Sequence, residues 1–255
     1  MTETGTLHLR PRPAAGGPAL DLPSTGPDPL PVDTALAAVR GYARGRRPLR
    51  YRSPNEREGR WVQVTAFGFA RFDERPVPAG PLGDEDVLVA EGLHGRLDPA
   101  GWSAVRRALD DAQPVADALA ARAAGRALDD LPDEELSVLG EPGTVGAALR
   151  ALGELPGVRA RYVLAALHHR HPALVPLTDR ATRLQLLPHV REGDSGPSAV
   201  VHRELRANAA ALADLQEALG AEGLHLSRLR LHDVLLWLSA TLRLTHAAAL
   251  GTALA

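Results

Sequence analysis

Cysteine and lysine are both absent from this 255-residue chain, and all 29 of its Lys or Arg positions are arginine. Without cysteine there is no disulfide, thiolate metal site, iron–sulfur cluster or cysteine nucleophile. Without lysine there is no Schiff base to a cofactor or a sugar, and no phosphate-binding loop that ends in Gly-Lys. Composition alone therefore excludes a large part of enzyme chemistry.

A strong net charge and long apolar runs are also missing. The formal net charge of -2 does not indicate a nucleic-acid partner, although a local basic face could still bind one. No run of about eighteen apolar residues occurs, so no membrane-spanning helix and no membrane partner are expected. The N-terminal residues lack the apolar core of a signal peptide, which predicts a cytoplasmic protein.

The first 33 residues differ in composition from the rest. Proline and glycine supply 11 of them, and no periodic apolar pattern runs through the segment. Such a composition buries too little surface to offset its ordering entropy, so residues 1–33 are predicted to form a disordered tail. Residues 34–255 are predicted to form one mostly helical domain.

Helical periodicity dominates that domain. Apolar spacing and capping signals predict a helix over Val32–Arg44, a long one from Ser198 to Leu219, and others that begin at Asp98 and Ser227. Only the aromatic stretch Trp61–Phe72 favours extended structure, as a short hairpin or a packed loop. The predicted fold class is mainly α, a bundle of many short helices.

Residues 146–187 carry the most specific pattern. Two amphipathic helices are joined by Leu155-Pro156-Gly157-Val158, where Gly157 can supply the positive φ of a tight turn. Backbone N–H groups at the start of the second helix would point outward, which suits a phosphate. A proline-containing segment follows and ends at Asp179, at the predicted N-terminus of another helix, where the helix dipole favours a carboxylate.

This pattern resembles the helix-hairpin-helix DNA glycosylase superfamily, in which a Leu-Pro-Gly-Val-Gly hairpin precedes a proline-containing segment that ends in the catalytic aspartate. Leu155 to Val158 match the hairpin, and Pro176 and Asp179 match that segment. The resemblance implies a monofunctional N-glycosylase that acts on a damaged or modified base in double-stranded DNA, with no cofactor and no metal. It implies roles for several residues: Asp179 in catalysis, Tyr162 in base stacking, and Gly157, Val158, Arg159, Arg161 and Arg170 in binding the DNA backbone.

Two departures from that superfamily affect the expected activity. The second hairpin glycine is Arg159 here, which hinders close backbone approach to a phosphate, although the arginine side chain could replace that contact. The lysine of the bifunctional members falls at Arg161. A guanidinium that is always protonated cannot form a Schiff base, so no lyase activity is expected.

A longer stretch of the chain resembles a family of uncharacterised actinobacterial proteins. The segments that carry this resemblance are Asp84–Ala90, His168–Pro176 and Leu229–Trp237. That family has no assigned activity, so this resemblance implies no function.

Each functional interpretation has a simpler alternative. Asp179 would also be explained as a plain helix N-cap. The cluster His168, His169 and His171 would need another nearby ligand to hold a metal, and a cationic helix C-terminus is the simpler interpretation. The arginine-rich stretch Leu155–Arg191 suits a DNA backbone and a solvated surface equally. The alternative to a glycosylase is a catalytically inactive helical scaffold that binds another protein.

Overall fold

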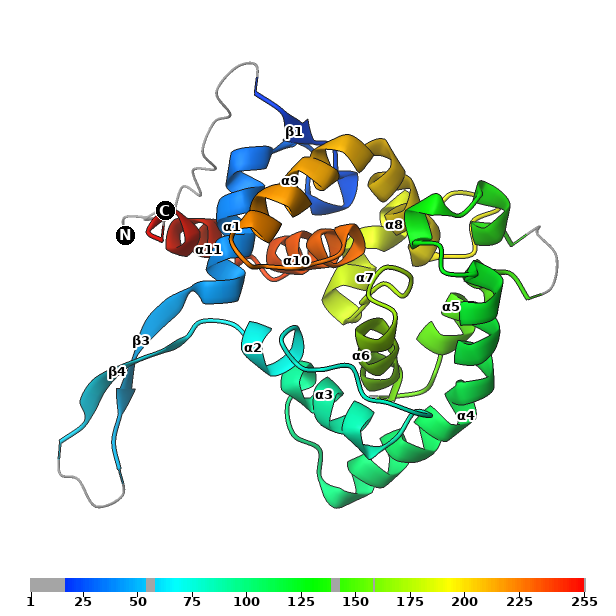
Figure 1. Ribbon diagram of the computed structural model, residues 1–255, viewed down its shortest axis with the longest axis horizontal. Helices are drawn as coiled ribbons and strands as arrows, with labels where there is room; N and C mark the ends of the chain where they lie inside the picture. The colour runs from blue at the N-terminus through cyan, green and yellow to red at the C-terminus, as the bar shows by residue number, and fades with distance from the viewer. Residues whose placement is uncertain (1–16, 54–57, 139–142, 158, 255) are drawn as a thin grey trace, which may run out of the picture.

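The computed structural model describes residues 17–53, 58–138, 143–157 and 159–254. Within these ranges the protein is mainly helical, which confirms the predicted fold class (Figure 1). The α-helices are α1 (Val32–Arg44), α2 (Phe69–Phe72), α3 (Asp84–His94), α4 (Pro99–Ala123), α5 (Val145–Gly153), α6 (Arg159–Arg170), α7 (Arg180–Leu186), α8 (Pro197–Ala207), α9 (Ala209–Ala221), α10 (Arg228–Ala240) and α11 (Leu244–Thr252). Two antiparallel pairs of strands complete the fold: β1 (Ala19–Leu20) with β2 (Leu30–Pro31), and β3 (Arg46–Tyr51) with β4 (Arg60–Thr65).

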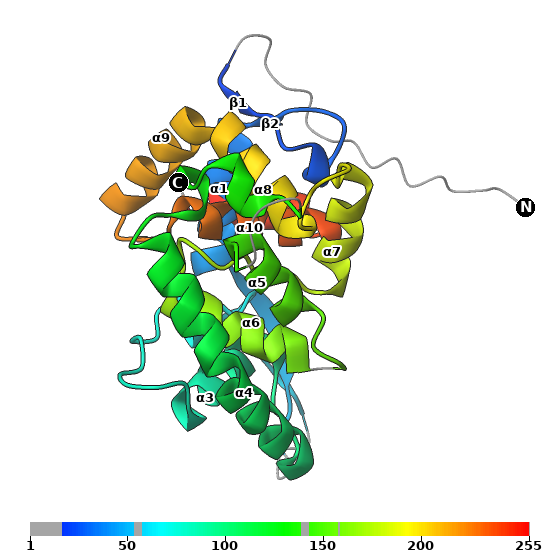
Figure 2. The same cartoon turned by 90° about the vertical axis from the view of Figure 1, so that its right-hand side faces the viewer.

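The helices pack in two groups that meet at the candidate site. In one group α6 packs against α3, α4 and α5, and in the other α10 packs against α1, α7, α8 and α9 (Figures 1 and 2). Ten of the thirteen residues of α10 are buried, so it is the central helix of its group. In the described ranges no single helix is long and apolar enough to cross a membrane; α10 and α11 meet that test only together, as a pair bent by 117°.

The N-terminal boundary differs from the prediction. Leu20 and Leu22 are buried, and the backbone N–H and hydroxyl of Ser24 donate to the carboxylate of Glu204 at 2.8 and 2.7 Å. The prediction of a disordered tail over residues 1–33 is therefore wrong for residues 17–33, because buried leucines and hydrogen bonds offset their ordering entropy. Residues 1–16 of the predicted tail lie outside the described residues.

The long helix expected from Ser198 to Leu219 is two helices, α8 and α9, separated at Asn208. The side-chain oxygen of Asn208 accepts from the backbone N–H of Asp21 at 2.7 Å, and its amide donates to the Asp21 carbonyl at 2.7 Å. An asparagine that hydrogen-bonds backbone groups competes with a continuous helix. At this break, the Asn208 side chain holds the N-terminal segment against α8 and α9.

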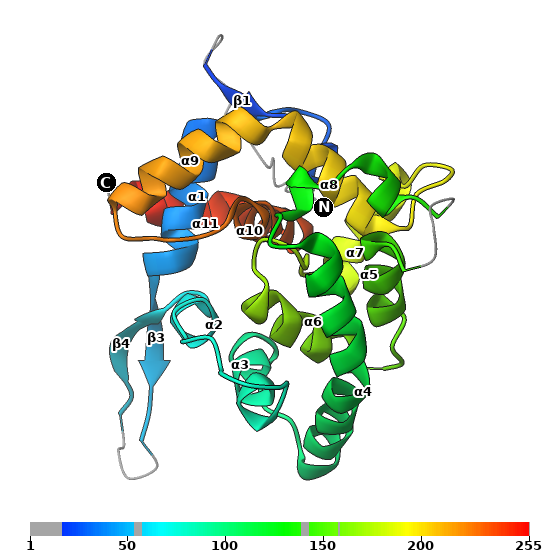
Figure 3. The ribbon, with the colours of Figure 1, turned by 45° about the vertical axis from the view of Figure 1, so that its right-hand side comes forward.

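Strands β3 and β4 form a hairpin, here called the arm, that leaves the body of the molecule beside α2 (Figures 1 and 3). The aromatic stretch from Trp61 predicted one half of it, whereas β3 comes from the basic stretch before it. Every residue of β3 is exposed, as are four of the six residues of β4. The arm is therefore not part of the hydrophobic core.

Two glycines allow α1 and α11 to cross closely. A Cβ on Gly251 would overlap the carbonyl oxygen of Ala37, and a Cβ on Gly41 would overlap that of Ala247. Backbone atoms cannot change rotamer to relieve an overlap, as a flexible side chain can, so the two helices would have to move apart.

We expect Gly251→Ala to lower the free energy of unfolding by about 1–3 kcal/mol, measured by urea denaturation, because it overpacks this crossing. Gly220→Ala is the matched control, since a Cβ at Gly220 meets only the His225 ring at 3.9 Å. It should leave stability unchanged or raise it slightly, because alanine favours a helix over glycine. Equal losses in the two variants would contradict the close crossing.

Candidate functional site

The turn between α5 and α6 has the backbone geometry that the sequence predicts. Gly157 has φ of +69° and is exposed, with open space where a Cβ would stand. Arg159 lies in the first turn of α6, and its Nε donates to the carbonyl of Pro156 at 3.2 Å. Val158, another of the expected DNA contacts, lies outside the described residues.

The segment that ends at Asp179 is held between α6 and α10. His168 Nδ1 lies 2.6 Å from the carbonyl oxygen of Val175, and the N–H of Leu177 donates to Asp233 Oδ2 at 2.9 Å. Burial lowers the pKa of His168 to about 4, so the ring is neutral at pH 7 and its Nδ1–H donates to the carbonyl. These two anchors place Asp179 beside the α5–α6 turn.

The Asp179 side chain serves only in part as a helix cap. Its Oδ1 accepts from the Thr182 N–H at 2.9 Å, and its own N–H donates to Thr182 Oγ1 at 2.9 Å. This reciprocal pair is a capping box. The residue is partly exposed, and among the described residues no hydrogen bond to its Oδ2 is found. One carboxylate oxygen is therefore left for another partner.

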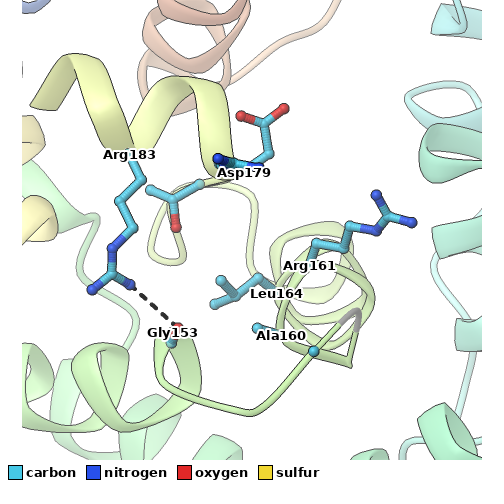
Figure 4. Close-up of a pocket in the computed structure, with 9 residues that line it drawn as sticks. Gly153, Ala160, Arg161, Leu164, Asp179 and Arg183 are labelled. Atoms are coloured by element: carbon cyan, nitrogen blue, oxygen red, sulfur yellow. Dashed lines mark hydrogen bonds between the residues drawn. The ribbon is translucent and has the colours of Figure 1, made fainter.

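A hollow of about 240 Å³ lies between the α5–α6 turn and the start of α7, and we call it the hairpin cavity (Figure 4). Its lining residues include Gly157, Arg161, Asp179, Arg180 and Arg183. Arg183 Nη1 donates to the carbonyl of Gly153 at 3.3 Å, which joins α7 to the end of α5. The Arg183 guanidinium lies at this cavity, and the exposed Arg180 begins α7 beside it, so the positive charge here suits an anion such as a phosphate.

A second hollow, of about 230 Å³, shares Arg161, Thr178 and Asp179 with the first. The rings of Tyr42, Phe67 and Trp237 line it, so we call it the aromatic cavity. The Trp237 ring centroid lies 6.3 Å from that of Tyr42 and 6.1 Å from that of Phe67, both in edge-to-face geometry. Figure 4 shows the Asp179 carboxylate and the Arg161 guanidinium turned away from Leu164 and Gly153 of the hairpin cavity.

A buried ion pair forms part of the aromatic cavity. Arg230 Nε lies 2.6 Å from Asp73 Oδ1, and its Nη2 donates to Asp73 Oδ2 at 2.9 Å and to the Tyr42 hydroxyl at 2.8 Å. Burial alone would lower the pKa of Arg230, but the Asp73 carboxylate raises it above its ordinary value. Burial raises the pKa of Tyr42, so its hydroxyl stays protonated. This arrangement fixes the positions of Arg230 and Tyr42.

Two expected contact residues face α3 instead of a ligand. Tyr162 is 1% exposed, and its hydroxyl donates to the carbonyl of Gly95 at 2.9 Å. The Arg161 guanidinium lies 5.2 Å from the ring centroid of Tyr162, so this ring offers no free face for a base. Arg170 forms a two-point ion pair with Asp86, in which both N–O distances are 2.7 Å. Tyr162 and Arg170 therefore hold α6 against α3.

The histidine cluster lies at the buried end of α6. Burial lowers the pKa of His168, His169 and His171, and that of His168 reaches about 4. Desolvation disfavours the charged imidazole, so Arg170 and not these rings is the fixed positive charge in the last turn of α6. In the described part of the chain, no group of three His, Cys, Asp or Glu residues is arranged to hold a metal ion.

Another buried histidine, His232, has a raised pKa. His232 Nε2 lies 2.7 Å from Glu204 Oε2. Burial alone would lower its pKa, but hydrogen bonding and charge from Asp233 and Glu204 raise it to about 9 from 6.5. A raised pKa gives stability that is complete below pH 6.5 and lost as the pH rises through about 9. The lowered pKa of His168 gives stability that is complete above pH 6.5 and lost as the pH falls through about 4.

We therefore expect stability to fall on both sides of about pH 6.5 in thermal unfolding followed by circular dichroism. His232→Gln should flatten the alkaline side, between pH 6.5 and about 9, whereas the loss that His168 causes between pH 6.5 and about 4 should persist. His225→Gln is the control, because His225 is exposed and should change neither side. An alkaline slope that persists in His232→Gln would show that another group causes it.

Comparison with known proteins gives one match. A family of unknown function, DUF6308, matches residues 50–240, three quarters of the chain. The chain belongs to this family. No curated protein and no solved structure matches the chain significantly. The DUF6308 segment includes the α5–α6 turn, Asp179 and Arg230, whereas α1, with Tyr42, and α11 lie outside it.

The residues of the aromatic cavity that were not predicted as site residues from the sequence include Tyr42, Phe67, His94, Arg230 and Trp237. One signal was present, because Arg230 and Trp237 belong to the Leu229–Trp237 segment that resembles the uncharacterised family. The half-buried Trp237 was interpreted as a core residue from its apolar helical position. His94 gave no signal, and burial together with Arg161 lowers its pKa to about 4, so it is neutral at pH 7.

Proposed function

We propose that the protein binds double-stranded DNA and hydrolyses the N-glycosidic bond of a damaged or modified nucleotide, with Asp179 as the catalytic carboxylate. One observation carries the proposal: the partly exposed Asp179 borders both a cationic cavity and an aromatic cavity. A nucleotide turned out of a duplex needs a grip on its phosphate, a place for its base, and a negative charge beside its sugar.

The DNA backbone would lie in the hairpin cavity. Arg180 and Arg183 supply the positive charge, and the turn at Gly157 brings backbone close to the surface. Arg159 stands where the resembled superfamily has its second hairpin glycine, and its guanidinium takes over part of the contact that the backbone would make. Arg170 has no part in this grip, since Asp86 holds it.

The extruded base would enter the aromatic cavity, where Tyr42, Phe67 and Trp237 provide apolar contact. This assignment transfers the stacking role from Tyr162 to these rings. Arg161 and the buried Arg230 would supply hydrogen-bond donors, and neutral His94, which already hydrogen-bonds the Arg161 backbone, would offer its other ring nitrogen.

The chemical step is the replacement of the base by water. The bond between the sugar C1′ and the base nitrogen breaks, and its electron pair leaves with the base. The Asp179 carboxylate stabilises the positive charge that develops on the sugar. Water adds to C1′ and gives up one proton, and the base takes one proton, so the products are an abasic site and the free base. The absence of lysine leaves the strand uncut.

A screen tests this proposal directly. Duplex oligonucleotides that carry one alkylated, deaminated or oxidised base are incubated with the protein, and alkali then converts abasic sites to strand breaks. A substrate should give breaks only after alkali. If no lesion gives product, the enzymatic claim fails. Binding of DNA without product would support a catalytically inactive DNA-binding protein, and no binding even at low salt would support the protein-binding scaffold.

A further inference from the structure

The arm concentrates positive charge on a surface whose described residues are mostly exposed. Its described residues, 46–53 and 58–65, include five arginines and one glutamate, in a chain whose net charge is -2. In the described ranges, the side chains of Arg46 and Arg50 make no hydrogen bond or ion pair, and both are exposed. The arm is therefore a local cationic surface on a slightly acidic protein.

The strand register divides the side chains of the arm between two faces. Arg50 stands opposite Trp61, and Arg46 stands opposite Thr65, so these four side chains share one face. Trp61 is 70% exposed. The other face carries Arg47 and Arg60 together with apolar side chains, among them Leu49 and Tyr51, which are 40% and 44% exposed. A large ring left in water between arginines is typical of a surface that a nucleic acid covers.

The arm begins at the rim of the aromatic cavity. Ala66 directly follows β4, and its N–H donates to the carbonyl of Gly45 at 2.8 Å, which closes the base of the hairpin. Ala66, Phe67 and Gly68 all line the aromatic cavity. Six residues of extended strand span about 20 Å. The arm therefore extends from the edge of the candidate site over a distance of about six base pairs of duplex, at about 3.4 Å each.

We propose that the arm is a second DNA-binding element, which contacts the duplex beside the nucleotide held at Asp179. Arg46 and Arg50 bind phosphates, and Trp61 packs against the sugars and base edges between them. A two-stranded ribbon exposed on both faces has the width that the major groove admits. The charge of the arm is complementary to DNA and repels a second copy of itself. This inference rests on the DNA-binding part of the proposed function and not on catalysis by Asp179.

Binding of an unmodified, fluorescein-labelled 20-base-pair duplex, followed by anisotropy over a series of salt concentrations, tests this inference. Arg46→Ala/Arg50→Ala should raise the Kd about tenfold at low salt and reduce the slope of log K against log salt by about two, one for each lost phosphate contact. Trp61→Ala should raise the Kd about threefold or more, because it removes the apolar contact with the sugars and base edges. The matched control, Arg106→Ala/Arg107→Ala on α4, removes the same charge from another face and should change the Kd less than twofold.

The outcomes separate the arm from the proposed function. If the arm variants bind like the control pair, the arm is not a DNA-binding element, although DNA binding itself stands. If the wild-type protein binds no DNA, both proposals fail. If the arm variants instead convert a dimer to a monomer in sedimentation, the arm is a self-association surface and the inference is overturned. Loss of base excision in Asp179 variants bears only on catalysis.

Discussion

Replacement of Asp179 by asparagine should reduce base excision by about 10²- to 10⁴-fold while leaving the DNA affinity and the melting temperature near those of the wild type. Asparagine keeps an oxygen at the position of Oδ1, which accepts from the Thr182 N–H, and it is as good an N-cap as aspartate. Only the negative charge beside the sugar is lost. The single-turnover rate on the substrate found by the screen measures the effect.

Asp98→Asn is the matched control for this variant. Asp98 is the N-cap of α4, where its Oδ1 accepts from the Gly101 N–H at 2.6 Å, and it lines neither cavity. The substitution makes the same chemical change at a helix start and should leave excision unaltered. An Asp179→Asn protein that excises bases at the wild-type rate would show that Asp179 is a cap and nothing more.

Removal of the Asp73 carboxylate should lower the free energy of unfolding by about 3–5 kcal/mol. Arg230 and Asp73 are only 6% and 4% exposed at their side chains, so Asp73→Ala leaves a guanidinium buried without its counter-ion. The Tyr42 hydroxyl, which lies 3.1 Å from Asp73 Oδ2 and donates to it, loses its acceptor as well. Urea denaturation followed by circular dichroism measures the loss.

Two further variants test whether the loss of stability comes from a charge left buried without a partner or from the loss of any ion pair. Asp73→Ala combined with Arg230→Met removes both charges and should recover much of the stability, since no ion is left unpaired. Asp110→Ala breaks the exposed pair with Arg106 and should cost less than about 1 kcal/mol. Equal losses for Asp73→Ala and Asp110→Ala would mean that water reaches Arg230, and that the aromatic cavity does not hold a fixed cation.

The sequence predicted the local structure well where a local signal was present. The bounds of α1 were predicted to the residue, and Asp98 and Ser227 cap α4 and α10 as expected. Apolar periodicity and a capping side chain are properties of neighbouring residues, and a single sequence contains both. The strands β1 and β2 could not be predicted in this way. Strands of two residues are too short to show a periodic pattern, and this N-terminal segment is held by Asn208 and Glu204, far along the chain.

Within the candidate site, too, the residues of a local motif could be predicted, and the residues brought together by packing could not. Asp179 and Gly157 could be predicted because both belong to one short motif whose spacing fixes their separation. The pairing of Arg230 with Asp73 could not, since the two residues are separated by 157 positions and only the packing of α10 brings them together. Tyr162 and Arg170 were misassigned although they lie on one face of α6, eight positions apart. That face packs on α3, and a helical pattern does not reveal which neighbour covers a face.

The glycine crossing of α1 and α11 also bears on the arm. Only Gly45 separates the end of α1 from β3, so the path of α1 sets the direction in which the arm leaves the body. The last helix of the chain thus orients an element built near its beginning, and both helices lie outside the segment that defines the family. A small rotation at Gly41 and Gly251 would move the far end of the arm, about 20 Å away, while α6 and α7 kept Arg161 and Asp179 in place. Family members that lack this pair of helices would therefore need some other support to set the direction of the arm.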